Sequence, residues 1–275
     1  MDVSGLAPIE QTALLTEYCR ALDSRSATPI LGDTVADSTV RQIDHDFAGL
    51  GASPSVVALV ALRAKMLDER IRAHVAANST AVVVDLGAGL SSAVWRVDPP
   101  ETVDWFSVDL PAVMSVRESL VPAHPRARSV AASVLETDWA AGIPADKPAM
   151  VFADGLFAFL DQDAVVGILR RITEHFASGV IAFNDYGTVS KANQIVGRLA
   201  TSSKSNSPHR QWNFPGFKDA RTPEAWNPDL RLLEEASAMQ RPEAALFPAG
   251  LRIASRLSRR VPSIARKARI LQYRF

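Results

Sequence analysis

Two glycines in a short turn are the residues best suited to bring the backbone of this chain against a ligand. They stand in Asp85-Leu-Gly-Ala-Gly89, which follows the apolar run Ala81–Val84. Glycine has no side chain, so the main chain can approach a bound molecule closely there, next to the N–H groups that begin the following helix. A dinucleotide pyrophosphate site favours a third glycine at position 92, where this chain has Ser92. The turn therefore indicates a ligand without a pyrophosphate.

A carboxylate stands at the end of the next apolar run. Asp109 lies about 20 residues after the glycine turn, a spacing at which a carboxylate can accept hydrogen bonds from both hydroxyls of a ribose. The alternative is that Asp109 only caps the helix expected after Pro111. Together the turn and the carboxylate predict a nucleoside site, and S-adenosylmethionine is a nucleoside without phosphate. Asp85 is then placed to influence the turn or the ammonium group of that ligand.

Candidates for a general base are scattered along the chain: His45, Asp185, Tyr186 and His209. No spacing ties either histidine to a partner, so an ordinary surface or hydrogen-bonded histidine is the competing interpretation of both. No HxH, HExxH or CxxC spacing occurs, and we expect no metal in the mechanism.

These residues lie within an alternation of strand and helix patterns. Short apolar runs rich in β-branched residues predict strands at 81–84, 103–108, 129–132, 150–153 and 180–183. Helical patterns lie between them, at 112–120 after Pro111 and at 162–176 after Asp161, a suitable N-cap. This alternation is typical of a doubly wound α/β sheet, whose ligands bind beyond the carboxyl ends of the strands.

The regions on either side of this core have different patterns. Apolar residues at helical spacing predict two helices between Pro8 and Asp46, and a long helix from Ser53-Pro54 to about Ala77. Residues 201–228 are rich in Ser, Asn, Pro and aromatic residues and predict a long loop or lid. Segments 230–233 and 270–275 are expected to close the sheet as a late hairpin. We therefore expect an N-terminal helical cover (1–52), a cofactor-binding core (53–200) and a lid with sheet-completing elements (201–275) in one compact unit.

The C-terminal third also holds two groups of residues with more than one interpretation. Aromatic residues that wall an apolar acceptor pocket, or that simply pack together, are Trp212, Phe214, Phe217 and Trp226. Basic residues without an accompanying acid occupy the last segment: Arg252, Arg256, Arg259, Arg260, Arg266, Lys267, Arg269 and Arg274. They are suited to attract a carrier protein or nucleic acid. A solvated basic face on a packed helix is favoured, because an apolar counterpart exists in Leu251, Leu257, Val261, Ile264 and Ile270.

Composition limits the class of protein. The chain has 275 residues with 47% hydrophobic and 22% charged residues, which is ordinary globular usage. Its 30 basic and 30 acidic residues cancel, so we expect no nucleic-acid partner. The single Cys19 fits a reducing cytoplasm, and the N-terminus lacks the pattern of a secretory signal. The most apolar windows are far shorter than the roughly 20 residues that cross a bilayer, so we expect no membrane span.

Motifs spread over nearly the whole chain resemble the leucine carboxyl methyltransferase superfamily, in particular its bacterial branch of polyketide-tailoring O-methyltransferases of the tetracenomycin type. In the core these are Leu-Gly-Ala-Gly-Leu at 86–90, Trp-Phe-Ser-Val-Asp-Leu-Pro at 105–111 and Ala-Asp-Gly-Leu at 153–156. Outside it they are the segments 20–25, 29–33, 43–47 and 230–235. The resemblance implies a class I methyltransferase: a Rossmann-like, mostly parallel, seven-stranded sheet that binds S-adenosylmethionine.

The resemblance also implies residue roles. Arg63 matches the arginine that binds the methionine carboxylate, with Lys65 as a second candidate. The other residues that it places at the cofactor are Gly87, Ala88, Gly89, Asp109, Leu110, Ser133, Val134, Leu135, Asp154 and Gly155. Within this set Asp109 would hold the ribose and residues 133–135 would frame the adenine.

Two departures from the family pattern stand out. Ser91-Ser92-Ala93 replaces the frequent Asp-Thr-Arg after the glycine turn, so one acid and one base are lost together. Asp154 replaces the usual Glu of the Glu-Gly-Leu motif, which moves a carboxylate back by one methylene and could widen the space around the reacting methyl.

The expected activity is O-methylation of a small natural product. The sulfonium is already an activated methyl donor, so a base is unnecessary for a carboxylate acceptor but useful for a phenol. A carboxylate is favoured because no strong base stands out. The alternatives are an isomerase or binding module that uses the same pocket without methyl transfer, a nucleic-acid methylase suggested only by the basic C-terminus, and a nicotinamide dehydrogenase, which Ser92 disfavours.

Overall fold

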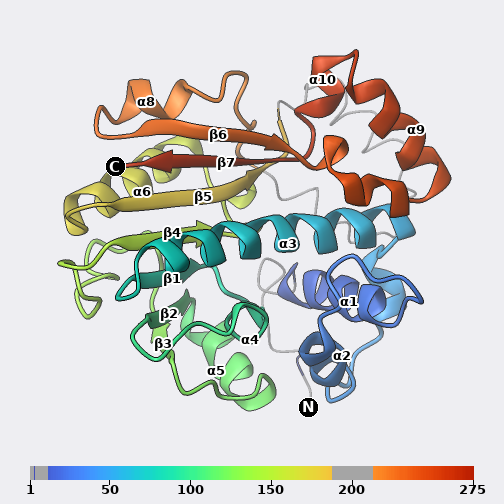
Figure 1. Ribbon diagram of the computed structural model, residues 1–275. Helices are drawn as coiled ribbons and strands as arrows, with labels where there is room; N and C mark the ends of the chain where they lie inside the picture. Colours follow the sequence, from blue (N-terminus) through green and yellow to red (C-terminus); the bar gives the residue numbers. More distant parts are fainter. Residues whose placement is uncertain (1–2, 4–11, 188–212) are drawn as a thin grey trace.

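The computed structural model describes residue 3 and residues 12–187 and 213–275 (Figure 1). Two of the residues singled out in the sequence, His209 and Trp212, lie outside these ranges.

A mixed seven-stranded sheet forms the centre of the molecule, with the strand order β3-β2-β1-β4-β5-β7-β6. The parallel strands are β1 (Val82–Leu86), β2 (Asp104–Asp109), β3 (Ala127–Ala131), β4 (Ala149–Ala153) and β5 (Gly179–Asp185). The last two strands, β6 (Arg231–Ser237) and β7 (Arg269–Arg274), pair antiparallel to each other, and β7 pairs antiparallel with β5. The predicted strands and the late hairpin are thus confirmed.

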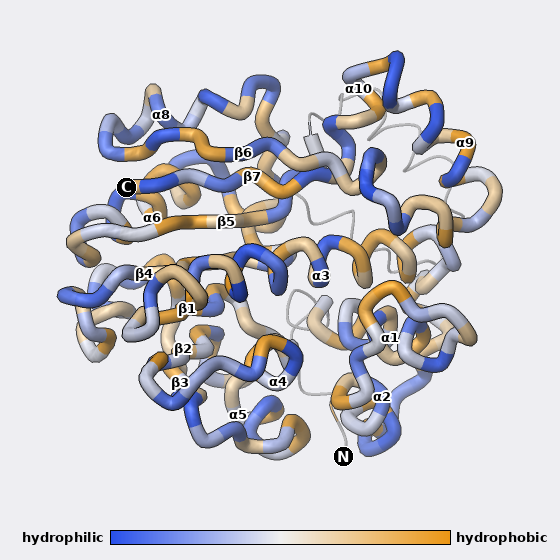
Figure 2. Tube along the Cα trace, in the orientation of Figure 1, coloured by the Kyte–Doolittle hydropathy of each residue, from blue (hydrophilic) through white to orange (hydrophobic). Residues whose placement is uncertain are grey.

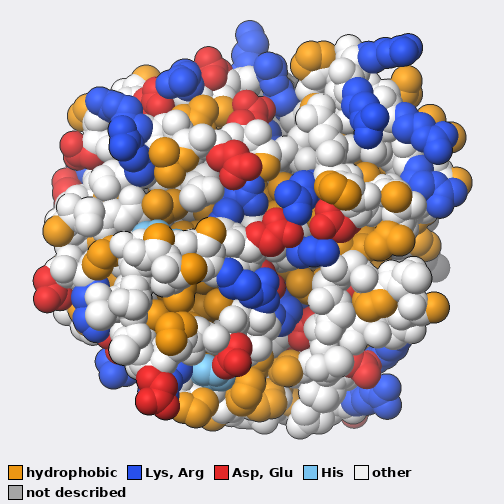
Figure 3. All heavy atoms as spheres, viewed as in Figure 1, with side chains coloured by type: hydrophobic (Ala, Val, Ile, Leu, Met, Phe, Trp, Pro, Cys, Tyr) orange, Lys and Arg blue, Asp and Glu red, His pale blue; other side chains and the backbone are white. Residues whose placement is uncertain are grey.

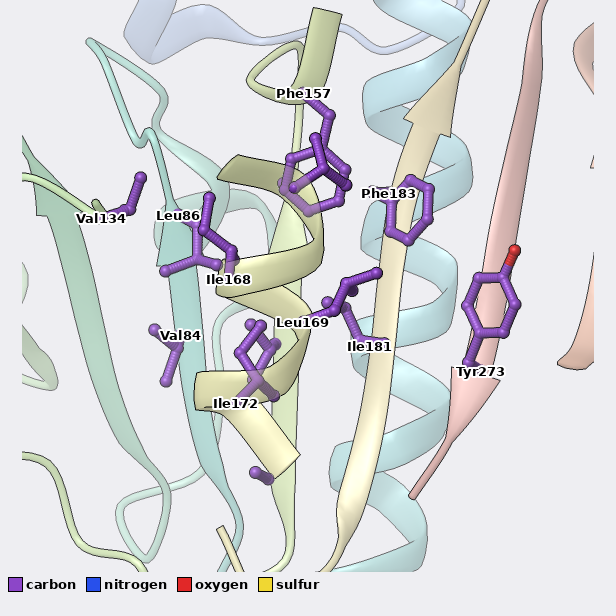
Figure 4. Close-up of a cluster of buried hydrophobic side chains, with 14 of the residues drawn as sticks. Val84, Leu86, Val134, Phe157, Ile168, Leu169, Ile172, Ile181, Phe183 and Tyr273 are labelled. Carbon is purple, nitrogen blue, oxygen red and sulfur yellow. The ribbon is translucent and has the colours of Figure 1, made fainter. Parts of the chain in front are cut away.

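Each face of the sheet is covered by a long helix, which explains why the central strands are apolar throughout. Every residue of β1 and β4 is buried. Helix α6 (Gln162–His175) packs Ile168, Leu169 and Ile172 against one face, where they meet Val84 and Ile181 (Figure 4). Helix α3 (Pro54–Ala77) crosses the other face (Figure 1).

Local sequence signals set the beginnings of these helices. At the start of α3, Ser53 precedes Pro54 and its side chain accepts a hydrogen bond from the Val56 N–H. At the start of α6, Asp161 accepts a hydrogen bond from the Ala164 N–H. The shorter helices α4 (Ala93–Val97) and α5 (Pro111–Leu120) follow β1 and β2. The helices predicted at Ser53, Pro111 and Asp161 are therefore confirmed.

The N-terminal helices lie beyond the edge of the sheet at which the parallel strands end (Figure 1). They are α1 (Thr12–Ser24) and α2 (Thr34–Val40), followed by the 3-10 helix η1 (Phe47–Leu50). The connection between α1 and α2 is held by Asp23, whose carboxylate accepts hydrogen bonds from the N–H groups of Ile30, Leu31 and Gly32. The two helices expected between Pro8 and Asp46 are present, at 12–24 and 34–40.

The described C-terminal region corrects one expectation. It contains α8 (Thr222–Trp226), the 3-10 helices η4 (Ala238–Gln240) and η5 (Pro242–Leu246), α9 (Ala249–Ser258) and α10 (Pro262–Ala265). Leu257 and Val261, expected to face inward, are 49% and 38% exposed, while Leu251 and Ile264 pack against the core. Hydrophilic and hydrophobic residues alternate along α9 in Figure 2, and Figure 3 shows Lys and Arg side chains around this corner of the molecule. The reason is that α9 and α10 are short and pack against each other and against η4 and η5 with only part of their apolar residues.

The core on the α6 side should govern stability. Replacing the fully buried Ile168 with Ala removes apolar contacts and leaves a cavity, so Ile168→Ala should lower the free energy of unfolding by about 2 to 5 kcal/mol. The matched control is Ile253→Ala on α9, where the side chain is 58% exposed and the change should cost less than about 0.5 kcal/mol. Urea denaturation measures both. Equal losses in the two variants would contradict the assignment of the core.

Candidate functional site

A cavity of about 620 Å³ opens at the carboxyl ends of the parallel strands, between α1, α3 and the loops that follow β1, β2 and β4. Apart from Lys65, it brings together the residues that were expected at a cofactor: Arg63, Asp85, Gly87, Ala88, Gly89, Asp109, Leu110, Ser133, Val134, Leu135, Asp154 and Gly155. These residues lie on separate elements of the chain, so their convergence on one cavity makes it the candidate site.

The glycine turn and Asp109 form one hydrogen-bonded unit. Gly87 and Gly89 have φ angles of 66° and 52°, in the left-handed region that favours glycine. One oxygen of the Asp109 carboxylate accepts a hydrogen bond from the Gly89 N–H, and the other accepts one from the Leu110 N–H. The donor–acceptor distance is 2.7 Å in both bonds. Helix α5 begins at Pro111 without a side-chain cap, so Asp109 is no cap of that helix. Instead, a fixed carboxylate faces the cavity and can accept further hydrogen bonds from a diol.

A buried carboxylate between two guanidinium groups forms the opposite wall of the cavity. Asp154 Oδ2 lies 2.7 Å from Arg20 Nη2, and Asp154 Oδ1 lies 2.7 Å from Arg63 Nε. Burial alone would raise the pKa of Asp154, but Arg63 and Arg20 outweigh it and lower that pKa. Asp154 is therefore ionised, and it holds both arginines at the cavity. Arg63 Nη2 is buried and has no hydrogen-bond partner within the described residues, which leaves a donor for an anion.

Two further buried acids, Asp85 and Glu17, have too little nearby positive charge to offset the effect of burial on their pKa values. Asp85 lines the cavity and its Oδ2 atom has no hydrogen-bond partner in the described part of the chain. Burial raises the pKa of Asp85 to about 7, with Arg117 acting against the rise. Glu17 of α1 is fully buried beside Arg20, and burial raises its pKa to about 7 as well. A cation arriving next to Asp85 would favour its ionised form.

The departure at residues 91–93 has a structural counterpart in this chain. The Ser92 hydroxyl lies 2.6 and 2.7 Å from the two carboxylate oxygens of Asp33, which begins α2. Arg96 pairs with both Asp33 and Asp68, at 2.6 and 2.8 Å. The turn is thus anchored to the N-terminal helices and to α3 through Ser92 and Arg96.

Of the candidate bases within the described residues, two reach the cavity and both are engaged. Asp185 pairs with Arg269 at 2.8 Å and accepts the Phe217 N–H at 3.2 Å. The Tyr186 hydroxyl accepts a hydrogen bond from Arg63, and burial raises the pKa of Tyr186. The remaining histidine, His45, packs edge-on to Phe47 and does not line the cavity. No described group of His, Cys, Asp and Glu residues is arranged to hold a metal ion.

Three other predicted site residues lie away from the cavity. Lys65 pairs with Glu243 at 3.0 Å on the outer side of α3. Phe214 and Phe217, expected in an acceptor pocket, are 7% and 3% exposed and pack in the core with Trp226. They do not line the large cavity but border a second, small one that also contacts Asp185 and Tyr186. These aromatic residues thus pack together, which is the second of the two alternatives given for them in the sequence.

Arg20 of the cavity wall was missed as a site residue. It belongs to a segment that carried the family resemblance, 20–25, but no residue pattern indicated its contact with Asp154, 134 positions later. Such a pairing depends on how α1 docks on the sheet, which residue spacing does not encode.

The charges and acceptors of the cavity match a ligand with three features. A donor of Arg63 suits a carboxylate, Asp85 suits an ammonium, and Asp109 suits a vicinal diol. An amino acid joined to a nucleoside carries all three. The residues present therefore fit S-adenosylmethionine.

Comparison with known proteins agrees with this fit. Residues 13–173 match the model of the family described as leucine carboxyl methyltransferase. The tetracenomycin polyketide synthesis O-methyltransferase TcmP of Streptomyces glaucescens is 37% identical over 179 residues, which cover 65% of this chain and 66% of that protein. An S-adenosyl-L-methionine-dependent methyltransferase of Gibberella zeae, dpfgK, is 31% identical over 204 residues, which cover 67% of this chain and 68% of that one.

Solved structures support the fold. A candidate methyltransferase of Thermobifida fusca superposes with a TM-score of 0.55 at 16% identity and covers 93% of each chain. The plantazolicin methyltransferase BamL, solved with S-adenosylhomocysteine and a substrate analogue, gives a TM-score of 0.52 at 9% identity and covers 97% of each chain. The architecture is that of class I S-adenosylmethionine-dependent methyltransferases, as predicted.

Glu17 should make the stability of the ligand-free protein depend on pH. Its folded pKa of about 7 lies above the ordinary 4.5, so folding favours the protonated form and stability is lost as pH rises between these values. Glu17→Gln removes this loss. The difference in unfolding free energy, variant minus native chain, should therefore be larger at pH 8 than at pH 4.5 by on the order of 2 kcal/mol.

The matched control is Glu174→Gln on α6, where the side chain is 63% exposed. Urea denaturation across this pH range measures all three proteins. A difference between Glu17→Gln and the native chain that stays constant with pH would contradict the environment assigned to Glu17.

Proposed function

The chain belongs to the leucine carboxyl methyltransferase family of S-adenosylmethionine-dependent enzymes, and on this premise we propose that it methylates an oxygen atom of a small natural product. The observation that carries the proposal is the cavity in which Arg63, Asp85 and Asp109 present a cation, a buried acid and a fixed carboxylate to one ligand. A polyketide-like acceptor is the substrate class suggested by the relative that acts in tetracenomycin synthesis.

Each part of the cofactor has a place among these residues. Arg63, held by Asp154, would bind the methionine carboxylate and Asp85 the ammonium. Asp109 would accept the ribose hydroxyls, and residues 133–135 would border the adenine. When bound, the cofactor supplies an electrophilic methyl group on a sulfonium. The protein then has to align the acceptor oxygen with that methyl group and to exclude water.

The two candidate bases at the cavity, Asp185 and Tyr186, are both engaged, which favours an acceptor that is already ionised. Asp185 is committed to Arg269, and the raised pKa of Tyr186 keeps its hydroxyl protonated near neutral pH. A carboxylate needs no base because it is ionised at neutral pH, whereas a phenol with a pKa near 10 does. We therefore propose a carboxylate as the acceptor group, with a hydroxyl as the alternative.

Formation of S-adenosylhomocysteine separates this function from its main rival. Incubation with S-adenosylmethionine and a panel of aromatic acids and phenols should yield S-adenosylhomocysteine and a methylated acceptor in equal amounts. Conversion of an acceptor without S-adenosylhomocysteine would favour the isomerase alternative instead.

We also propose a protein partner and a cellular location for the enzyme. The exposed apolar residues Ile253 and Leu257, flanked by Arg252 and Arg256, suit contact with an acidic carrier protein. The buried Cys19 is compatible with the reducing cytoplasm in which we propose that the enzyme works. No helix in the described ranges combines the length and the apolar content that crossing a membrane requires.

Asp109 provides a direct test of the cofactor site. Asp109→Asn replaces a charged acceptor of two ribose hydrogen bonds with a neutral amide, so it should weaken S-adenosylhomocysteine binding by about ten- to a hundredfold. Asp104→Asn is the matched control, because Asp104 begins the same strand and pairs with Lys147 away from the cavity. Calorimetric titration measures both affinities. Equal affinities in the two variants would contradict the ribose role.

Tyr186 distinguishes the two acceptor types. If the acceptor is a carboxylate, Tyr186→Phe should change kcat by less than about fivefold, since no proton has to be removed. A catalytic base would make the loss about a hundredfold or more, with an altered pH profile. Tyr186 also contacts Arg63, so the affinity for S-adenosylhomocysteine is measured alongside as a control. A large loss of kcat with unchanged cofactor affinity would favour the hydroxyl acceptor.

A further inference from the structure

One end of the cavity is not needed by the cofactor. The glycine turn follows β1, Asp109 ends β2 and residues 133–135 follow β3, while Arg63 is held by Asp154 after β4, so the proposed cofactor extends from β4 over β1 toward β3. The cavity continues past β4, over the ends of β5 and β7. There it is lined by Tyr186, Lys267 and Ala268. This end, called the acceptor end below, is where the methyl acceptor has room.

Lys267 is placed at the acceptor end by the pairing of β7 with β5. The last residue pair of these antiparallel strands joins Asp185 to Arg269, so two residues further along Lys267 comes opposite Gly187. The close approach of Gly187 to the carbonyl oxygen of Arg266 agrees with this register. Lys267 itself is exposed and lines the cavity, so this residue lies at the rim rather than in the core.

The acids around the acceptor end are paired with other residues, so Lys267 can bind an anionic ligand. Asp154 is bound by Arg20 and Arg63, and Asp185 is bound by Arg269. Lys267 makes no ion pair with any residue in the described ranges. The remaining residues of the chain, 1–2, 4–11 and 188–212, contain only two acids, Asp2 and Glu10. Because the carboxylates of Asp154 and Asp185 are neutralised by arginines, a lysine at the mouth of this cavity attracts an anion.

Part of the cavity wall is apolar. Val56 and Leu59 of α3 face the cavity from one element, and Phe159 and Leu160 face it after β4. All of them are half-buried in the ligand-free protein, so they offer apolar surface for a ligand to cover.

We infer that Lys267 binds an acidic group of the acceptor, and that the substrate is therefore an apolar acid whose body lies against Val56, Leu59, Phe159 and Leu160. The inference rests on the proposed methyltransferase function and adds to it a residue that selects the acceptor. Lys267 acts on acceptor binding and orientation and has no part in holding the cofactor.

The test uses 2-naphthoate and its neutral analogue 2-naphthamide as probes, titrated into the full chain in the presence of saturating S-adenosylhomocysteine. The native protein should bind 2-naphthoate more tightly than the amide. Lys267→Met should weaken 2-naphthoate about fivefold and leave the amide unchanged, because an ion pair at an exposed rim supplies an effect of about this size. Lys267→Arg should restore the preference, and added salt should reduce it. The matched control, Lys218→Met, removes the same charge at an exposed position that does not line the cavity and should change neither affinity.

Three outcomes would overturn the inference: no preference of the native protein for the acid, an equal loss of acid and amide affinity in Lys267→Met, or an equal effect in Lys218→Met. In each of these cases S-adenosylhomocysteine binding would still be intact, and the proposed methyl transfer would stand. Failure of the native chain to bind S-adenosylhomocysteine would instead remove the function on which the inference rests.

Discussion

The ion pair network of Arg20, Asp154 and Arg63 joins the three parts of the molecule that make the cavity. Arg20 comes from helix α1, Arg63 from helix α3, and Asp154 from the loop after β4. Because the carboxylate is buried between two guanidinium groups, loss of Asp154 would leave two buried arginines without the counter-charge that they share. The network therefore ties α1 to the strand ends, where α1 supplies one wall of the cavity.

The same network prepares the cavity for its ligand. Asp154 neutralises part of the charge of two arginines but leaves a donor of Arg63 unused. Asp109 lines the cavity and is held in place by the N–H groups of Gly89 and Leu110. Such preformed donors and acceptors lower the cost of ordering the site when the ligand arrives. The shorter side chain of Asp154, compared with the glutamate that is frequent in the family, still reaches both arginines.

The sequence predicted what depends on local patterns. The strand and helix alternation, the caps at Ser53 and Asp161, and the convergence of Asp109 with the glycine turn follow from periodicity and from the geometry of parallel sheets. What it did not predict depends on docking between distant segments. Arg20 meets Asp154, Ser92 meets Asp33, and Phe214 turns into the core, and each contact joins residues whose spacing along the chain carries no signal. The exposure of Leu257 has the same origin, because it depends on which residues of α9 pack against η4 and η5.

Calorimetric titration of the native chain with S-adenosylhomocysteine, beside separate titrations with adenosine and with methionine, tests whether this cavity binds an amino acid joined to a nucleoside. We expect one-to-one binding of S-adenosylhomocysteine, much tighter than that of either fragment, since the carboxylate, ammonium and ribose sites would be occupied together. No detectable heat with S-adenosylhomocysteine, or an affinity no greater than that of adenosine alone, would contradict it.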